Sequence, residues 1–255
     1  MENITSRSNP VCVHLRKLGK SKSYREEHGQ FLCDGRKLLE EAIRCGVDID
    51  IVLSSEVLDY DFSENIYVYL SHDSLIDSIS PLQTSQGLLF VCRFPQVVDC
   101  DFSEGTHLLL DNVQDPGNVG TIIRTAHAFG IRSVILTEGS ADIYNPKTLR
   151  ASMGAVFKQQ VCYKSNDDIK ALIKNNVKFL GTSNDIGSID ITDINLKNAI
   201  IILGNEGQGV SQDLLEICCD VINIPLSPDC ESLNVAAAAT IIAWEAVRGS
   251  VKCHL

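Results

Sequence analysis

The sequence predicts an α/β protein in which a largely parallel sheet carries helices on both faces, preceded by a smaller α/β domain. From residue 106 onward, apolar strand-like runs alternate with helical segments, the order that produces parallel sheets. Shorter elements of both kinds alternate before residue 95, and a polar, turn-rich stretch containing a proline separates the two regions. We therefore expect an N-terminal domain at 1–95, a linker at 96–105 and a second domain at 106–255.

The elements of the N-terminal domain follow from helical spacing, apolar alternation and terminating residues. A basic helix and loop occupy 8–30, and Asp34 caps a helix that Gly46 closes. The other expected helix is 71–79, after the capped one at 36–44, and the expected strands are 31–33, 49–53, 66–70 and 87–92.

The second region repeats strand, loop and helix. Its expected strands are 107–111, 133–137, 158–163, 178–182, 199–203 and 221–226, and its expected helices are 118–129, 145–154, 166–175 and an alanine-rich helix after residue 234. In helix 118–129 the apolar positions share one face at helical spacing. Arg124 falls roughly opposite the centre of that face, at about 100° per residue.

Two late strands end in loops suited to close backbone approach. Strand 199–203 runs into the glycine-rich loop GNEGQG (204–209), and strand 221–226 leads through a turn to the segment SLN (232–234). Ligands of α/β sheets bind at the carboxyl ends of strands, so this stretch predicts a small-molecule site. The glycine spacing does not match the dinucleotide fingerprint, and no lysine follows to make a phosphate-binding loop. A plain tight turn, and a helix N-cap role for Asn234 or Ser232, remain alternatives.

Charge is unevenly distributed along the chain. The net charge of −11 argues against a protein that coats nucleic acid non-specifically, yet residues 1–45 carry a net +3 and the remainder −14. Five basic residues follow one another with no acid among them: Arg16, Lys17, Lys20, Lys22 and Arg25. They predict contacts with RNA phosphates, with a solvated helix face as the alternative.

Targeting and cysteine patterns point to a cytoplasmic protein without membrane contact. The N-terminal residues lack the apolar core of a secretory signal, and the longest apolar stretch is too short to span a bilayer. The ten cysteines include no C-x-x-C pair and have no histidine at ligand spacing, so we expect reduced thiols and no metal. Cys230 lies in the glycine- and serine-rich region, but no nearby histidine supports a nucleophile, and we expect a structural role.

Three segments, in this order, resemble the motifs of the SpoU/TrmH family of RNA ribose methyltransferases, part of the SPOUT superfamily. They are DNVQDPGNVGTIIRTAHAFG (111–130), LGNEGQGV (203–210) and IPLSPDCESLNVAAAATIIAWE (224–245). The resemblance covers 106–255 strongly. More loosely, scattered positions between Ser8 and Ala42 resemble the family's N-terminal RNA-binding domain, which is similar to a ribosomal-protein fold.

The resemblance implies a C-terminal trefoil knot, which the usual absence of knots would not suggest. It also implies S-adenosylmethionine as cofactor and a homodimer in which each active site uses residues of both subunits. The residues then expected in the cofactor pocket are Thr182, Ser183, Leu203, Gly204, Asn205, Gly207, Ile224, Leu226, Ser232, Leu233 and Asn234.

The implied reaction is methyl transfer to a ribose 2′-hydroxyl of structured RNA, ribosomal RNA being favoured over transfer RNA by the added N-terminal domain. The catalytic residues expected from the resemblance are Arg124, Asn118, Glu206, Ser232 and Asn234. Arg124 would act as base or proton relay. Because an arginine is normally always protonated, a second role is kept open, in which Arg124 holds a phosphate and stabilises the developing alkoxide.

Two other functions are weighed against this one. A non-catalytic RNA- or ribosome-binding factor on the same fold would bind no cofactor. A nucleotide-binding oxidoreductase is disfavoured by the glycine pattern and by its position near the C-terminus.

Overall fold

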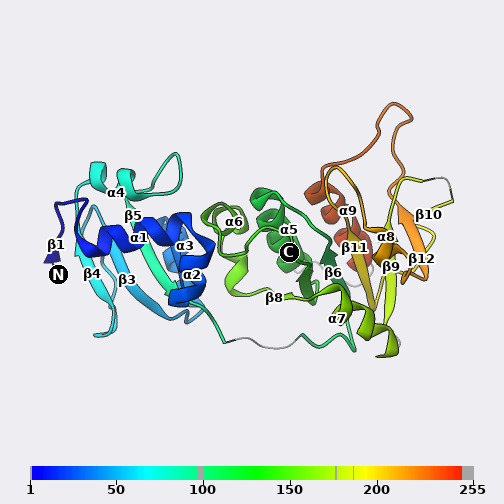
Figure 1. Ribbon diagram of the computed structural model, residues 1–255, viewed down its shortest axis with the longest axis horizontal. Coiled ribbons are helices and arrows are strands. Elements are labelled where there is room, and N and C mark those ends of the chain that lie inside the picture. Colours follow the sequence, from blue (N-terminus) through cyan, green and yellow to red (C-terminus); the bar gives the residue numbers. More distant parts are fainter. Residues whose placement is uncertain (1, 97–99, 176, 186, 249–255) are drawn as a thin grey trace. The chain divides into compact units, whose positions relative to one another are not determined.

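The computed structural model of the protein describes residues 2–96, 100–175, 177–185 and 187–248 (Figure 1). The chain forms two compact units, Met1–Val97 with Asp142–Phe157, and Val98–Ala141 with Lys158–Leu255. A single boundary near residue 100 therefore does not separate them, since a segment between two strands of the second unit belongs to the first. Residues 97–99 of the expected linker lie outside the described residues.

The first unit is built on a five-stranded mixed sheet with the strand order β1-β4-β3-β5-β2. Strand β3 pairs parallel with β4 and antiparallel with β5. The strands are β1 (Glu2–Asn3), β2 (Gln30–Asp34), β3 (Ile49–Ser54), β4 (Tyr67–Leu70) and β5 (Leu88–Arg93). The helices are α1 (Pro10–Lys20), α2 (Lys22–His28), α3 (Arg36–Arg44), α4 (Asp73–Ile79) and α6 (Pro146–Ser152), and a 3-10 turn, η1, spans Ala155–Phe157.

Two hydrophobic clusters cover the two faces of this sheet. Cluster one contains α1 and α4 side chains such as Leu15 and Ile76. Cluster two contains α3 side chains together with Leu149 of α6, and Tyr144 and Phe157 pack against it. The segment 142–157 thus supplies part of the first unit's core, which explains its place in that unit.

The second unit is built on seven parallel strands in the order β10-β12-β9-β11-β6-β7-β8. These are β6 (His107–Leu110), β7 (Ser133–Leu136), β8 (Gln160–Tyr163), β9 (Lys178–Thr182), β10 (Ile189–Asp190), β11 (Ala199–Leu203) and β12 (Asp220–Asn223). The helices are α5 (Pro116–Phe129), α7 (Asn166–Ala171), α8 (Gln212–Leu215) and α9 (Val235–Val247), with a 3-10 turn, η2, at Leu172–Asn175. The predicted α/β class with a large parallel sheet is confirmed, whereas the knot stays a prediction.

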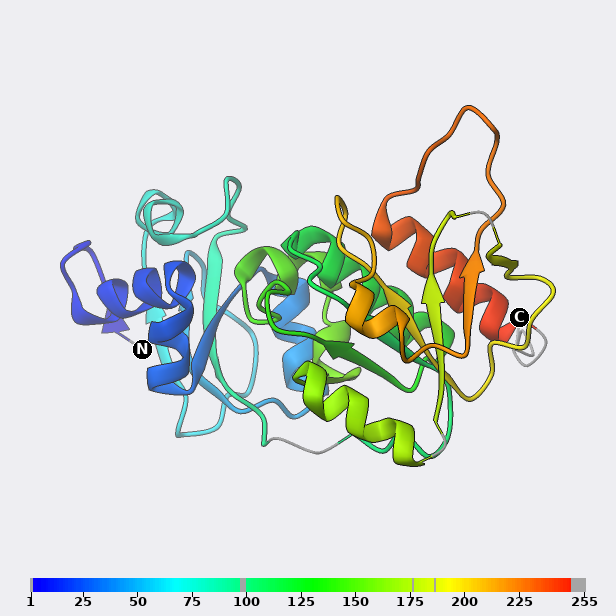
Figure 2. The ribbon, with the colours of Figure 1, turned by 45° about the vertical axis from the view of Figure 1, so that its right-hand side comes forward.

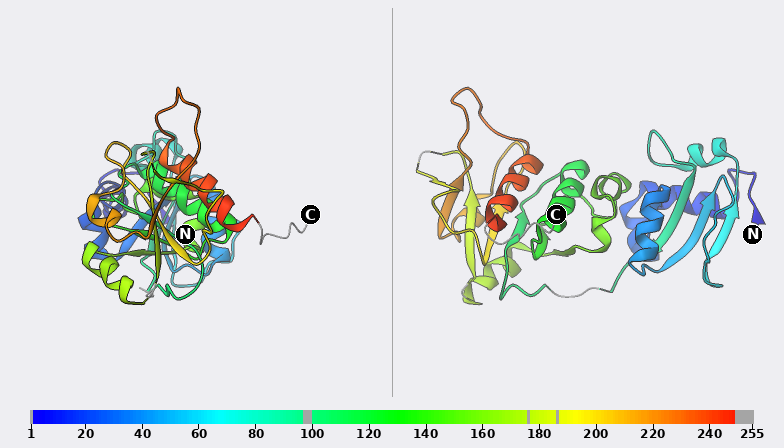
Figure 3. Two further views of the ribbon diagram at one scale, coloured as in Figure 1. Left: turned by 90° about the vertical axis from the view of Figure 1, so that its right-hand side faces the viewer. Right: turned by 180° about the vertical axis from the view of Figure 1, so that it is seen from behind.

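Helices cover both faces of the parallel sheet. Helices α5 and α9 pack against each other on one face, and α7 and α8 contribute Ile169 and Leu214 to a core on the other (Figure 3). All five residues of β11 are buried, as expected for a central strand with both faces covered. Figure 2 shows the long loop between β12 and α9 extending away from the sheet. In the described part of the chain, no helix is long and apolar enough to cross a membrane.

Several expected boundaries differ from those observed. The basic segment 8–30 forms two helices, because Ser21 ends α1 and caps α2. Asp34 does not cap α3; Gly35 takes that position with φ 117°, and the Asp34 carboxylate accepts bonds from Ser80 Oγ and Gln86 N instead. The strand expected at 221–226 ends at Asn223. Helix α5 begins two residues early, because Asp115 caps it and Pro116 fills the first turn.

Candidate active site

A cavity of about 740 Å3 lies at the carboxyl ends of β9, β11 and β12. The loops that follow these strands form its walls, as expected for a parallel sheet. Every residue expected in the cofactor pocket lines it, namely Thr182, Ser183, Leu203, Gly204, Asn205, Gly207, Ile224, Leu226, Ser232, Leu233 and Asn234. The structure therefore brings together segments that are about fifty residues apart in the chain.

The glycine-rich loop after β11 is a tight hairpin closed on itself. Asn205 and Gly209 exchange both backbone hydrogen bonds, at 3.0 and 2.9 Å. A Cβ atom on Gly204 would stand 2.0 Å from the Gly209 carbonyl carbon, so only glycine fits there. Gly204 therefore permits close contact between two parts of the loop's own backbone.

Asn205 and Asp111 fasten this hairpin to the end of the neighbouring strand β6. The Asn205 amide donates to the backbone oxygen of Asn112 at 2.8 Å, and its oxygen accepts from Gly207 N and Gln208 N at 2.9 and 3.1 Å. The buried carboxylate of Asp111 accepts from Ser211 N at 2.7 Å. Asp111 was not among the expected site residues, although its place at a strand's carboxyl end is the signal that could have identified it.

A chain of side-chain hydrogen bonds joins the three sequence motifs. Asn234 Nδ2 donates to Asn118 Oδ1 at 3.0 Å, and Asn118 Nδ2 donates to Glu206 Oε1 at 2.9 Å. Asn234 also caps α9, because its Oδ1 accepts from Ala236 N and Ala237 N. The N-cap and site roles of Asn234 are therefore compatible. We name these three residues the Asn234–Asn118–Glu206 relay.

The remaining expected catalytic residues lie apart from this relay. Ser232 is exposed on the loop before α9 and lines the cavity. Arg124 is exposed on α5, does not line the cavity, and makes no hydrogen bond or ion pair within the described part of the chain. Its position opposite the buried face of α5 agrees with the spacing argument, since Ile122, Ile123 and Ala126 are buried.

The five basic residues that were expected to contact RNA do not all reach solvent. Lys17 lies over the ring of Tyr24, at 5.1 Å from its centroid, Lys20 is exposed, and Lys22 pairs with Glu26 at 3.8 Å. Arg16 is half-buried and donates to the Arg7 carbonyl. The prediction that Arg25 faces RNA is corrected: only 3% of Arg25 is exposed, because its guanidinium is paired with Asp142 and donates to the Leu18 carbonyl.

No disulfide joins the cysteines in the part of the chain that the structure describes, and Cys253 lies outside that part. Burial raises the pKa of Cys218 to about 12, so this thiol stays protonated and unreactive at neutral pH. Cys230 is exposed in the loop before α9, and its Sγ donates weakly to the Ser232 carbonyl at 3.5 Å.

Comparison with solved structures places this fold in a defined class of enzyme. The rRNA methyltransferase of Sinorhizobium meliloti with AdoMet bound has a TM-score of 0.88 and 28% identity, with 98% of each chain covered. A protein of the TrmH family from Porphyromonas gingivalis has a TM-score of 0.85 and 34% identity, covering 95% of this chain and 99% of that one. The fold and the cavity at its strand ends define an S-adenosylmethionine-dependent RNA methyltransferase.

Sequence comparison identifies the family. Residues 105–244 match the SpoU rRNA Methylase family, and residues 9–89 match the MRM3-like substrate binding domain. The 23S rRNA (guanosine(2553)-2′-O)-methyltransferase RlmP of Bacillus subtilis is 34% identical over 250 residues, 96% of this chain and 98% of that protein. The mitochondrial rRNA methyltransferase 3 of Mus musculus is 27% identical, over 90% of this chain and 70% of that protein. The chain belongs to the SpoU rRNA methylase family, and the predicted family, cofactor and class of reaction are confirmed.

Proposed function

We propose that the protein methylates a ribose 2′-hydroxyl of large-subunit ribosomal RNA, with the cavity holding the cofactor and the first unit binding the RNA. The observation that carries the proposal is the cavity at the ends of β9, β11 and β12, with the Asn234–Asn118–Glu206 relay beside it. The Bacillus subtilis relative, matched over nearly its whole length, is named for a guanosine of 23S rRNA.

The cavity walls fit S-adenosylmethionine. Apolar side chains such as Leu203, Ile224 and Leu226 suit the adenine ring, and the polar loops suit the ribose and the amino acid part. Asn223 also lines the cavity, and its buried Oδ1 has no hydrogen-bond partner among the described residues, so an acceptor is available for a ligand amino group. When bound, the cofactor supplies a methyl group activated by its sulfonium.

The relay gives the polar edge of the site a fixed geometry. The amide of Asn234 is held by the first turn of α9 and in turn orients Asn118, which holds the Glu206 carboxylate. In the proposal, Ser232 and the relay position the ribose, and Glu206 accepts a hydrogen bond from it. Because a hydroxyl is a poor nucleophile at neutral pH, this placement and help in losing its proton are what the protein must provide.

Arg124 is proposed to act in the cavity of a partner subunit. It is exposed and lies outside the lining of its own cavity. The adjacent α5–α9 surface carries large apolar side chains, since Trp244 is 49% and Ile241 37% exposed, and Phe129 contacts Trp244. Exposed apolar groups of this kind favour an interface between subunits. We propose a homodimer through this surface, with Arg124 holding a phosphate and stabilising the alkoxide, or acting as base.

Mixed dimers test that arrangement. Arg124→Ala and Asn234→Ala homodimers are each expected to be inactive. After exchange of subunits, a heterodimer would retain one intact site, and activity would recover to about a quarter of wild type by random pairing. If Arg124 serves its own cavity, no heterodimer contains an intact site and activity does not recover.

The first experiment is methyl transfer from tritiated S-adenosylmethionine to unmodified ribosomal and transfer RNA transcripts. Nuclease digestion and nucleoside analysis should place the label in a 2′-O-methylated nucleoside of large-subunit rRNA, and mapping would then identify the nucleotide. Label in transfer RNA would replace the substrate part of the proposal. A protein that neither transfers label nor binds cofactor would instead be a non-catalytic RNA-binding factor.

The basic surface of α1 and α2 is proposed as a site of RNA binding. Neutralising Arg16, Lys17, Lys20 and Lys22 together should weaken binding to an unmodified 23S rRNA transcript. The slope of log affinity against log salt should fall by about 3, at roughly 0.7–0.9 for each phosphate that the protein no longer neutralises. Unchanged affinity would leave these residues as a solvated helix face.

Three further proposals concern the trefoil knot, the cellular compartment and the need for a metal ion. We propose that the chain around 204–234 forms the trefoil knot, which is supported by the way that both the 204–209 loop and the 224–234 segment line one cavity. We also propose cytoplasmic action and transfer without a metal ion. Undiminished turnover in a chelator would support the last point, and loss of turnover would refute it.

A further inference from the structure

Residues 142–157 lie between β7 and β8 of the methyltransferase sheet in sequence but belong structurally to the first unit. The anchoring is extensive. The Tyr144 ring stacks on Phe31 and Phe94, with centroids 4.6 and 4.5 Å apart, and Leu149 is buried in the same core. Arg150 donates to the Thr84 carbonyl at 3.0 Å. The segment is therefore an integral part of the unit that carries α1 and α2.

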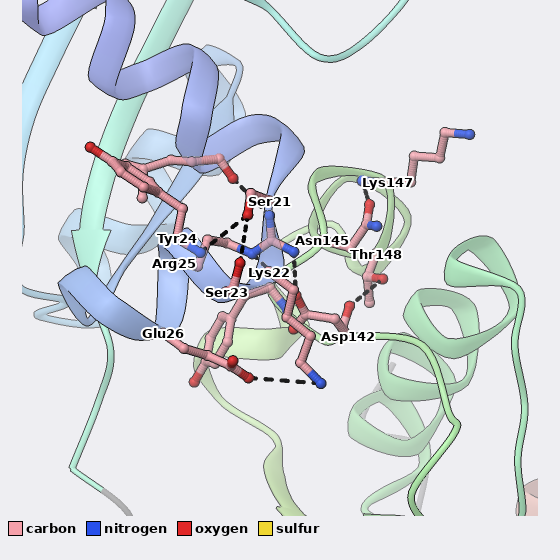
Figure 4. A network of polar contacts seen from close by, with 12 residues as sticks. Ser21, Lys22, Ser23, Tyr24, Arg25, Glu26, Asp142, Asn145, Lys147 and Thr148 are labelled. Atoms are coloured by element: carbon pink, nitrogen blue, oxygen red, sulfur yellow. Dashed lines mark hydrogen bonds and ion pairs between the residues drawn. The ribbon is translucent and has the colours of Figure 1, made fainter.

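A buried ion pair fixes the start of this segment. Figure 4 shows Arg25 reaching from α2 to Asp142, ahead of α6. Two guanidinium nitrogens of Arg25 donate to Asp142 Oδ2, one of them at 3.1 Å. The other Asp142 oxygen accepts from Tyr144 N, and its backbone oxygen accepts from Thr148 Oγ1, both at 2.9 Å. Asp142 thus ties α2 to the first turn of α6.

The pair also determines the charge that the segment presents to solvent. Asp142 is the only acidic residue of 142–157, and Arg25 neutralises it. The exposed charged side chains of α6 are Lys147 and Arg150. In Figure 4 the Lys147 side chain extends away from the Arg25–Asp142 network. The segment therefore presents cationic charge without a competing carboxylate of its own.

We propose that α6 is part of the RNA-binding surface of the first unit, that Lys147 and Arg150 contact RNA phosphates, and that the Arg25–Asp142 pair positions them. This inference rests on the proposed function, in which the first unit binds RNA. The RNA surface is thereby assigned to two separate stretches of sequence, 8–30 and 142–157. Arg25 is a positioning residue, because it acts through α6 and not on RNA directly.

The first test removes the two cations. In the full-length protein, Lys147→Ala/Arg150→Ala should lower affinity for an unmodified 23S rRNA transcript about tenfold, and the log–log salt slope should fall by about 1.5 for two phosphates. Lys197→Ala/Lys178→Ala removes the same charge at the amino ends of β11 and β9, opposite to the cavity end, and should leave the slope nearly unchanged. Equal effects of the two pairs of substitutions, or no effect of either, would overturn the proposal.

The second test separates positioning from simple charge. Asp142→Asn removes a negative charge and keeps Lys147 and Arg150, so electrostatics alone would tighten RNA binding. If the pair positions α6, the KM for the RNA transcript rises while the KM for S-adenosylmethionine and kcat stay unchanged, and Asp142→Glu restores part of the loss. If Asp142→Asn fails to fold, Arg25→Lys, which keeps the charge, is used for the same measurement. Tighter or unchanged RNA binding would refute the positioning role.

These outcomes are distinguishable from failure of the proposed function. A wild-type protein that neither binds the transcript nor methylates it would remove the function itself. A wild-type protein that does both, beside substituted proteins that behave identically to it, would remove only the assignment of α6 to the RNA surface.

Discussion

Helices α2 and α5 each carry one arginine, and the two side chains have opposite environments. Arg25 on α2 is buried, paired with a carboxylate that lies 117 residues away, and bonded to a backbone carbonyl. Arg124 on α5 is exposed and makes no ion pair among the described residues. The first guanidinium has its donors engaged within the protein, whereas the donors of the second are available to a ligand.

The difference in environment predicts that Arg25 contributes to stability and Arg124 to the reaction. Removing Arg25 leaves the Asp142 carboxylate buried without its counter-ion, which is costly to the folded state. Removing Arg124 leaves no buried group unpaired, so its loss should affect the reaction and hardly the fold. Substitutions at the two positions therefore test whether Arg25 stabilises the fold and Arg124 serves the reaction.

The largest effect is expected at Arg124. Arg124→Ala should lower kcat by about 10²–10³, the usual cost of removing one group that stabilises developing charge. Binding of S-adenosylmethionine, measured by calorimetry, should stay close to wild type, and the free energy of unfolding should change by less than about 0.5 kcal/mol. Retained turnover would remove Arg124 from the catalytic residues.

Arg25→Met should instead destabilise the protein by about 3–5 kcal/mol, the cost of breaking a buried pair by removing one partner. Urea unfolding followed by circular dichroism measures this change. The double variant Arg25→Met/Asp142→Asn removes both charges and should recover part of the stability. A loss below about 1 kcal/mol for Arg25→Met, the range of exposed pairs, would show that the interaction behaves as a surface ion pair.

Gly204→Ala should lower the free energy of unfolding by about 1–3 kcal/mol, the usual cost of overpacking, because it disturbs the hairpin of the glycine-rich loop. The new Cβ meets the Gly209–Val210 backbone at 2.0–2.1 Å, so the hairpin must open, and S-adenosylmethionine binding should weaken with it. Gly207→Ala is the matched control for folding, because its Cβ meets only Asn205 Oδ1, at 3.6 Å. Similar unfolding midpoints for the two variants would contradict the described hairpin geometry.

A smaller effect is expected from pH. Burial lowers the pKa of His107, at the start of β6, from its ordinary value of 6.5. The unfolded chain therefore binds a proton that the folded one excludes, and stability is lost as pH falls from about 6.5 towards the lowered value. Urea midpoints at pH 7.5 and 5.5 should differ less in His107→Gln than in wild type. An equal difference in the two proteins would show that His107 does not cause the loss.

The segments that line the cavity were easier to predict than the connections between distant segments. The orientation of Arg124 followed from helical spacing, and a cavity at the loops after β11 and β12 followed from ligand sites lying at the carboxyl ends of strands. The loop after β9 was expected only from the family resemblance. The Arg25–Asp142 pair could not be predicted, because no local pattern links residues so far apart, and Asp142 reads as an ordinary loop residue. The predicted cap of α3 was wrong for a related reason. The Asp34 carboxylate accepts hydrogen bonds from Ser80 and Gln86, which are distant in sequence.

The chain passes from one unit to the other three times, and this limits how segments can be exchanged between related proteins. A fragment that ends at residue 97 would lack Tyr144, Leu149 and Phe157, and its Phe31 and Phe94 rings would lose their stacking partner. A chimera that takes only the N-terminal part from another family member would therefore combine one protein's α2 with another's α6. If the first unit binds the RNA as proposed, transferring RNA specificity between such enzymes requires exchanging two blocks of sequence together, 1–97 and 142–157.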